Sequence, residues 1–141
     1  MNLSYFGIAV AILALPAFAD ECPNIEIGEE RSLSDIPKQW PEDVPRPTEL
    51  KNIGGLLSKN ERSCTVDLYG RIADPGEQFL MQYETELVSA GFELQDQYQI
   101  GDRLTLRFER EDLNLVVGSS VVNARTDNEY TELGLVLTIP N

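Results

Sequence analysis

The sequence predicts an α+β fold in which one amphipathic helix packs on a four- to six-stranded, mainly antiparallel sheet, giving two layers. Three observations predict this class. Residues 63–72 alternate between apolar and polar side chains, as a half-buried strand does. Residues 75–90 instead repeat their apolar side chains at helical spacing. Residues 92–139 return to alternation interrupted by short turn signals, which is typical of an antiparallel meander.

Two strands are expected before the helix. Residues 53–57 form a short apolar run that predicts the first. The second covers residues 63–72 and has two distinct faces. The face expected to be buried comprises Cys64, Val66, Leu68, Gly70 and Ile72, and the opposite face comprises Thr65, Asp67, Tyr69 and Arg71.

The helix has a clear start and a clear end in the sequence. Asp74 is expected to cap its first turn, with Pro75 at the first helical position and Glu77 completing a capping box. Gly91 is expected to end it in a left-handed conformation. The apolar stripe between these limits comprises Phe79, Leu80, Tyr83, Leu87 and Ala90.

Four more strands are expected after the helix. They cover residues 92–100, 104–108, 113–122 and 133–139, with turns at Gly101-Asp102, Glu111-Asp112 and residues 126–129. The run Gly118-Ser119-Ser120, in the middle of the third of these strands, predicts a bulge there.

The chain divides into three parts. Residues 5–19 are almost wholly apolar and end in Pro-Ala-Phe-Ala, which predicts that residues 1–19 are a secretory signal peptide cleaved after Ala19. An uncleaved anchor is the alternative, although the apolar run is short for a membrane-spanning helix. Residues 20–50 form an acidic, proline-rich leader, and residues 51–141 form a single α+β domain. The expected location is therefore periplasmic or extracellular, reached by the general secretory route.

The charge balance constrains the partners. The chain has 24 acidic and 11 basic side chains, no histidine, and a net charge of −13. Such an excess of negative charge disfavours nucleic acids and anionic membrane surfaces, and it favours solubility or a cationic partner. The leader is expected to be an extended, solvated segment; the alternative is an acidic arm for a basic partner.

Two cysteines, Cys22 and Cys64, lie in the part expected to be exported. In an oxidising compartment such a pair predicts one disulfide bond. The bond would tie the start of the mature chain to the strand at residues 63–72.

One sequence pattern carries a resemblance. Pro45-x-Pro47 precedes a strand, and Tyr83-x-x-x-Leu87-x-x-x-Gly91-Phe92 then leads into hairpins. Over residues 45–139 the chain resembles small secreted bacterial domains that carry the pattern P-x-P … Y-x-x-x-L-x-x-x-G-[FW] ahead of a β-meander. These domains have no agreed activity, so the resemblance implies a fold and export alone.

The residue types present exclude several kinds of chemistry. Without histidine, neither a Ser-His-Asp nor a Cys-His catalytic group can form, nor a histidine-based metal site. No glycine-rich phosphate loop and no EF-hand calcium loop occurs. No cofactor, metal or catalytic residue is therefore predicted. A carboxylate pair acting as a hydrolase stays as an alternative, without particular residues to carry it.

The polar face of the sheet is the candidate interaction surface. Tyr69 and Arg71 lie on one strand, and Arg103, Thr105 and Arg107 lie on another. If these strands are neighbours, arginine and tyrosine, which commonly anchor interfaces, gather on one surface. The alternative is a solvated face whose arginines form salt bridges with Asp67 and Glu109.

These observations favour a non-enzymatic binding or accessory module of the bacterial cell envelope. One alternative is an inhibitor or chaperone-like partner of a cationic exported protein, and the other is the carboxylate-pair hydrolase. The partner, the oligomeric state and the strand order are not predicted by the sequence.

Overall fold

A computed structural model of the protein describes residues 22–72 and 76–141. The expected signal peptide and its cleavage site lie outside these residues. The described elements are β1 (Glu30–Leu33), β2 (Lys51–Lys59), β3 (Ser63–Ile72), α1 (Gly76–Ser89), β4 (Glu93–Ile100), β5 (Arg103–Arg110), β6 (Leu113–Val122) and β7 (Tyr130–Pro140).

The strands form one antiparallel sheet in the order β1-β2-β3-β7-β6-β5-β4. The α+β class is as expected, but the sheet has seven strands, and the expectation of four to six was wrong. The additional strand is β1, whose sequence Glu-Arg-Ser-Leu has no apolar alternation and lies among prolines. It pairs with β2 through four register positions.

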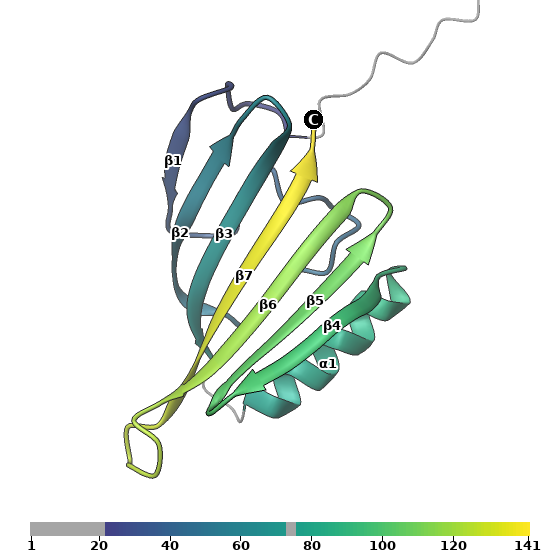
Figure 1. The fold of residues 1–141 in the computed structure, drawn as a ribbon. Helices are drawn as coiled ribbons and strands as arrows, with labels where there is room; N and C mark the ends of the chain where they lie inside the picture. Colours follow the sequence, from purple (N-terminus) through teal and green to yellow (C-terminus); the bar gives the residue numbers. More distant parts are fainter. Residues whose placement is uncertain (1–21, 73–75) are drawn as a thin grey trace, which may run out of the picture.

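The helix α1 carries the chain from the middle of the sheet to its far edge. After β3 the chain passes along α1, enters β4, and returns strand by strand until β7 lies beside β3 (Figure 1). The helix and the loops of residues 34–50 lie behind the sheet in this view, on the same side. The opposite face, toward the viewer, has no helix or loop of the described residues over it. We call it the outer face.

The hydrophobic core lies between the sheet and this second layer. Every second residue of the central strands points into it, as the alternation predicted. Its sheet side comprises Leu57, Cys64, Val66, Leu68, Ile72, Leu106, Phe108, Leu115, Val117, Leu133, Leu135, Leu137 and Ile139. The helix contributes Phe79, Leu80, Tyr83 and Leu87, which are the predicted stripe without the half-buried Ala90.

The described part of the leader is folded rather than extended. Ile25, Trp40, Val44 and Leu50 are buried in the same core. The Trp40 indole Nε1 donates a hydrogen bond to the Val44 carbonyl at 3.0 Å, which closes a turn within this segment. The proline-rich sequence rules out a long helix but does not prevent packing, because its apolar side chains are spaced along a chain of tight turns.

The predicted disulfide is present. Cys22 and Cys64 are bonded, with their Cα atoms 6.2 Å apart, and both are buried. The bond joins the first described residue to the beginning of β3.

The helix ends as the sequence predicts. Gly91 has a φ of 93°, in the left-handed region that favours glycine. The Gly91 amide donates to the Val88 carbonyl and the Phe92 amide donates to the Leu87 carbonyl, both at 3.0 Å. These two bonds define a Schellman motif. The predicted start signals, Asp74 and Pro75, lie outside the described residues.

The strand irregularities lie elsewhere than expected. The register of β6 with both β5 and β7 is continuous, so the bulge predicted at Gly118-Ser119-Ser120 does not form. Shifts occur instead between Lys51 and Gly54 in β2 and between Leu94 and Asp96 in β4. The second shift places Tyr98 and Ile100 on the outer face instead of the inner one, and all eight residues of this edge strand are exposed.

Candidate functional site: the outer face of the sheet

The cross-strand register places the side chains of the outer face in rows. Read from β2 to β4, the central rows are Leu56–Asp67–Val136–Val116–Arg107–Asp96, then Gly54–Tyr69–Gly134–Gly118–Thr105–Tyr98, and then Lys51–Arg71–Glu132–Ser120–Arg103–Ile100. Taken together, the rows contain apolar, aromatic and charged residues, so this face differs from both the buried core face and a uniformly charged surface.

All five predicted interaction residues lie on this face, but they do not form one cluster. β7 and β6 lie between β3, with Tyr69 and Arg71, and β5, with Arg103, Thr105 and Arg107. The predicted surface required β3 and β5 to be neighbours, and they are not. At about 4.8 Å per strand, the two groups are about 14 Å apart.

The arginines of β5 are partly engaged with local carboxylates. Arg107 forms an ion pair with Glu109 at 3.4 Å, as the solvated alternative expected for Glu109. Both side chains are exposed, so this pair stabilises the fold little. No ion pair between Asp67 and any described residue is present.

Two glycines form a bare floor at the centre of the outer face. Gly118 on β6 and Gly134 on β7 are register partners on adjacent central strands. A Cβ added to either would have only one heavy atom within 4 Å, a main-chain carbonyl oxygen at 3.9 Å. Both positions therefore have room for a side chain, although each is occupied by glycine.

Other glycines of the sheet have a packing reason. A Cβ on Gly70 would collide with the Leu50 side chain, and one on Gly55 would collide with the Asp67 carbonyl. At Gly54 the obstacle is the phenol end of Tyr69, whose ring lies over this glycine. Since the ring leans toward β2, it does not cover the neighbouring floor at Gly134.

A hollow of about 380 Å³ opens at one end of this face, across β2, β3 and β7. It is lined by Asn52, Tyr69, Gly70, Arg71, Tyr130 and Glu132. The register shift in β2 places Asn52 here, and its φ of 53° is unusual for a residue with a side chain. A bulge that re-aims a side chain toward a hollow is a common feature of binding sites.

Arg71 is the central cation of this hollow. Its guanidinium lies over the Tyr130 ring, 4.1 Å from the ring centroid. Glu132 is its register partner on β7, yet the two form no ion pair. Within the described residues, Arg71 donates no side-chain hydrogen bond. Stacking thus orients the guanidinium while leaving its N–H groups unused.

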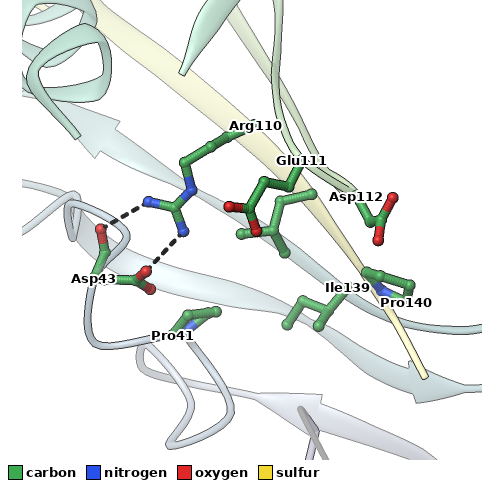
Figure 2. A pocket seen from close by; sticks show the side chains of 8 residues that line it. Pro41, Asp43, Arg110, Glu111, Asp112, Ile139 and Pro140 are labelled. Carbon is green, nitrogen blue, oxygen red and sulfur yellow. Dashed lines mark hydrogen bonds and ion pairs between the residues drawn. The ribbon is translucent and has the colours of Figure 1, made fainter. Parts of the chain in front are cut away.

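A second hollow, of about 280 Å³, lies at the end of the sheet where β5 turns into β6 (Figure 2). Its arginine, Arg110, is fully engaged. The guanidinium donates to the Asp43 carboxylate at 2.9 Å, to the Asp43 carbonyl at 3.4 Å and to the Ala90 carbonyl at 2.9 Å. It also lies over the Phe92 ring. Arg110 therefore joins the leader, the end of α1 and the sheet, and it serves the fold.

The residues that carry the family resemblance meet in space. The Tyr83 hydroxyl donates a hydrogen bond of 2.8 Å to the Pro45 carbonyl, so the helix is bonded to the segment containing Pro45-x-Pro47. Burial raises the pKa of Tyr83 well above its ordinary value, and the Glu86 carboxylate raises it further. Tyr83 therefore stays protonated as a donor. The pattern has a structural role in joining leader, helix and sheet.

The carboxylates of the described residues form no enclosed catalytic arrangement. Glu93, Glu109 and Glu111 line another hollow, but none of them is buried. A general acid in a glycosidase needs shielding from water to keep its proton near neutral pH. In residues 22–72 and 76–141, no three Cys, Asp or Glu side chains are grouped to hold a metal ion.

No protein-family model, curated protein or solved structure matches this chain. The described helix α1 is not long and apolar enough to cross a membrane. The site is therefore interpreted from its own geometry. Sequence reasoning found Tyr69 and Arg71 but missed Asn52, Tyr130 and Glu132, which join them only through the register. The glycine floor could have been noticed in the sequence, because Gly134 lies inside a strand of alternating apolar residues.

Proposed function

We propose that this protein is a non-enzymatic binding module of the bacterial cell envelope and that the outer face of its sheet is the binding surface. The observation that carries the proposal is the glycine floor of Gly118 and Gly134. Glycine in the interior of a strand costs roughly 0.5–1 kcal/mol relative to alanine. Here neither a bulge nor a neighbouring side chain explains it.

A glycine without such a reason often marks the close approach of a ligand or of another backbone. The surroundings of the floor suit this role. Val116 and Val136 lie on one side of it, and Ser120 and Glu132 lie on the other. A partner would thus meet apolar and hydrogen-bonding groups within one short distance, as at the centre of an interface.

Two features support the proposed cell compartment. The Cys22–Cys64 disulfide supports an oxidising environment, and the expected signal peptide at residues 1–19 supports export. Cell fractionation with N-terminal sequencing tests this part. We expect a mature chain that begins at Asp20 in the periplasmic or secreted fraction; a chain that retains Met1 in the membrane fraction would contradict cleavage.

Site-specific crosslinking in the intact envelope tests the binding surface. A photoreactive residue at Thr105 or Ser120, beside the floor, should give a discrete crosslinked product. The same residue at Met81 or Val88, both exposed on α1, should not. Gly134→Val should abolish the product by filling the floor. Crosslinking that is equal on both faces, or unaffected by Gly134→Val, would refute this surface.

A cationic exported protein remains the second candidate partner, supported by the net charge of −13. Steering by charge predicts association that weakens steeply as salt is added. Capture of the crosslinked product at low and high salt distinguishes this candidate. A complex that is unchanged by salt would exclude charge steering.

A further inference from the structure

We infer that the hollow between β2, β3 and β7 is a subsite for the carboxylate of an acidic glycan, with Arg71 as the residue that binds it. This inference rests on the proposed function, because the hollow is part of the same outer face. It names the ligand class for that end of the surface.

Arg71 is held by an aromatic ring rather than by a carboxylate. Arg31, Arg107 and Arg110 form ion pairs with carboxylates. Arg71 instead stacks on Tyr130, and its N–H groups have no acceptor in the described residues. A planar fork held in this way is suited to bidentate binding of a carboxylate.

The local charge also bears on the ligand. Lys51 is the register partner of Arg71 on β2, so two cations lie side by side at this end of the face. Among the described residues, Glu132 is the one carboxylate that lines the hollow. At physiological ionic strength, charges more than about 8 Å away are largely screened. The local pair of cations, rather than the net charge, therefore governs an anion bound here.

The position of the hollow favours a glycan over a peptide. The hollow lies on the face of the sheet, where the backbone groups of β3 are already paired with β2 and β7. A peptide laid here would leave its own amide groups unpaired. Sugar hydroxyls need only side-chain partners, and the side chains of Asn52 and Glu132 and the two tyrosine hydroxyls make no hydrogen bond to another described residue.

The Tyr69 ring provides an exposed aromatic surface that a sugar ring can face. It lies over Gly54 and is 53% exposed, so a large apolar surface faces solvent beside Arg71. An aromatic face with polar groups at its edge matches a sugar ring, which has an apolar face and a rim of hydroxyls. The glycine floor lies next in the same row and could take the following sugar.

Three probes of equal length test the inference: a tetrasaccharide of glucuronic acid, the glucose tetrasaccharide with the same linkage, and a tetraglutamate peptide. Binding is measured by calorimetry and by amide chemical shifts. We expect the glucuronate probe to bind with shifts confined to β2, β3 and β7. The glucose probe and the peptide should each bind at least about tenfold more weakly, because the glucose probe lacks the carboxylates and the peptide lacks the sugar rings.

The matched variants are Arg71→Ala and Arg62→Ala, which remove one exposed positive charge each; Arg62 lies in the turn between β2 and β3. Arg71→Ala should weaken glucuronate binding at least about tenfold by removing charge-assisted hydrogen bonds. Arg62→Ala should leave it nearly unchanged. Arg71→Lys keeps the charge but loses the planar guanidinium, so its affinity for glucuronate should lie between those of the parent chain and Arg71→Ala. Circular dichroism and thermal melting check that each variant is folded.

Several results would overturn the inference. They are no glucuronate binding at about 10 mM, equal losses in Arg71→Ala and Arg62→Ala, or equal binding of the glucose probe. Tighter binding of the peptide would assign the carboxylate to a protein partner and refute the glycan. The crosslinking at Thr105 and Ser120 is independent of these measurements, so failure here is distinguishable from failure of the binding surface.

Discussion

Two arginines of this protein, Arg110 and Arg71, lie over aromatic rings but differ in their hydrogen-bond partners. The Arg110 side chain is only 16% exposed and bonds to both the leader and the end of α1. Arg71 is exposed and stacks on Tyr130 without a hydrogen-bond acceptor in the described residues. The same residue type is therefore structural in one place and available for binding in the other, depending on the acceptors within its reach.

At Arg110 we expect the bond to Ala90 to contribute more than the ion pair. Asp43 is 73% exposed, so the pair is worth about 0–1 kcal/mol. Asp43→Asn should therefore lower the free energy of unfolding by less than about 0.5 kcal/mol. Arg110→Ala also removes the hydrogen bond to the Ala90 carbonyl and the contact with Phe92, and should cost about 1–2 kcal/mol. Urea unfolding of both variants measures this, and equal losses would contradict the assignment.

Tyr83 predicts a dependence of stability on alkaline pH. Its pKa in the folded protein is raised by burial and by Glu86, above the value of about 10 expected in the unfolded chain. The stabilisation from this difference is therefore fully present below about pH 10 and is lost as the pH rises through the folded-state pKa.

Tyr83→Phe tests this dependence. The variant should be less stable at neutral pH by about 1 kcal/mol, because it loses the hydrogen bond to Pro45. Its stability should then fall less between about pH 9 and pH 11 than that of the parent chain. Urea unfolding across this range measures both quantities. A parallel decline in the two proteins would show that Tyr83 does not carry the effect.

Among the elements, the strands contain glycines of two kinds: those that the backbone requires and those that it does not. Gly55 has a φ of 156° and its Cα faces the Asp67 carbonyl, so glycine is required there by the backbone. Gly118 and Gly134 have neither constraint. Only the latter pair is a candidate for a functional role, since the fold would accept a side chain at both positions.

Alanine substitution separates these two cases. Gly118→Ala and Gly134→Ala should each raise the free energy of unfolding by up to about 1 kcal/mol, because alanine reduces the entropy of the unfolded chain at an unstrained site. Gly55→Ala should lower it by more than about 2 kcal/mol, because its Cβ collides with the backbone of β3. Destabilisation by Gly118→Ala or Gly134→Ala would mean that these glycines serve the twist of the sheet instead.

For the whole molecule, the disulfide joins the start of the leader to β3 of the sheet. The bond closes a loop with a sequence separation of 42 residues, from the first described residue to β3. The loop contains β1, the leader and β2, so it restricts much of the unfolded chain.

The double variant Cys22→Ala with Cys64→Ala should lower the free energy of unfolding by about 4 kcal/mol on the chain-entropy estimate. Since the leader supplies part of the core, we expect the whole domain to lose stability rather than the leader alone. Urea unfolding of the oxidised protein, the reduced protein and the variant measures the effect. Unchanged stability, or release of the leader in a separate transition, would contradict this expectation.

The sequence by itself determined the class of fold, the position and end of α1, the disulfide, and which face of β3, β5 and β7 is buried. These follow from local periodicity and capping, which depend on residues close in the chain. It also placed Tyr69 and Arg71 on the outer face. The alternation in β4 was less informative, because a register shift turned Tyr98 and Ile100 outward.

Only the tertiary structure decided the strand order, the addition of β1, and the packing of the leader into the core. It also brought Asn52, Arg71, Tyr130 and Glu132 to one hollow and set Gly118 beside Gly134. The physical reason is that a period of two tells which face a residue occupies but not which strand lies next to it. Neighbours are selected by packing of the whole chain, across separations that no local pattern records.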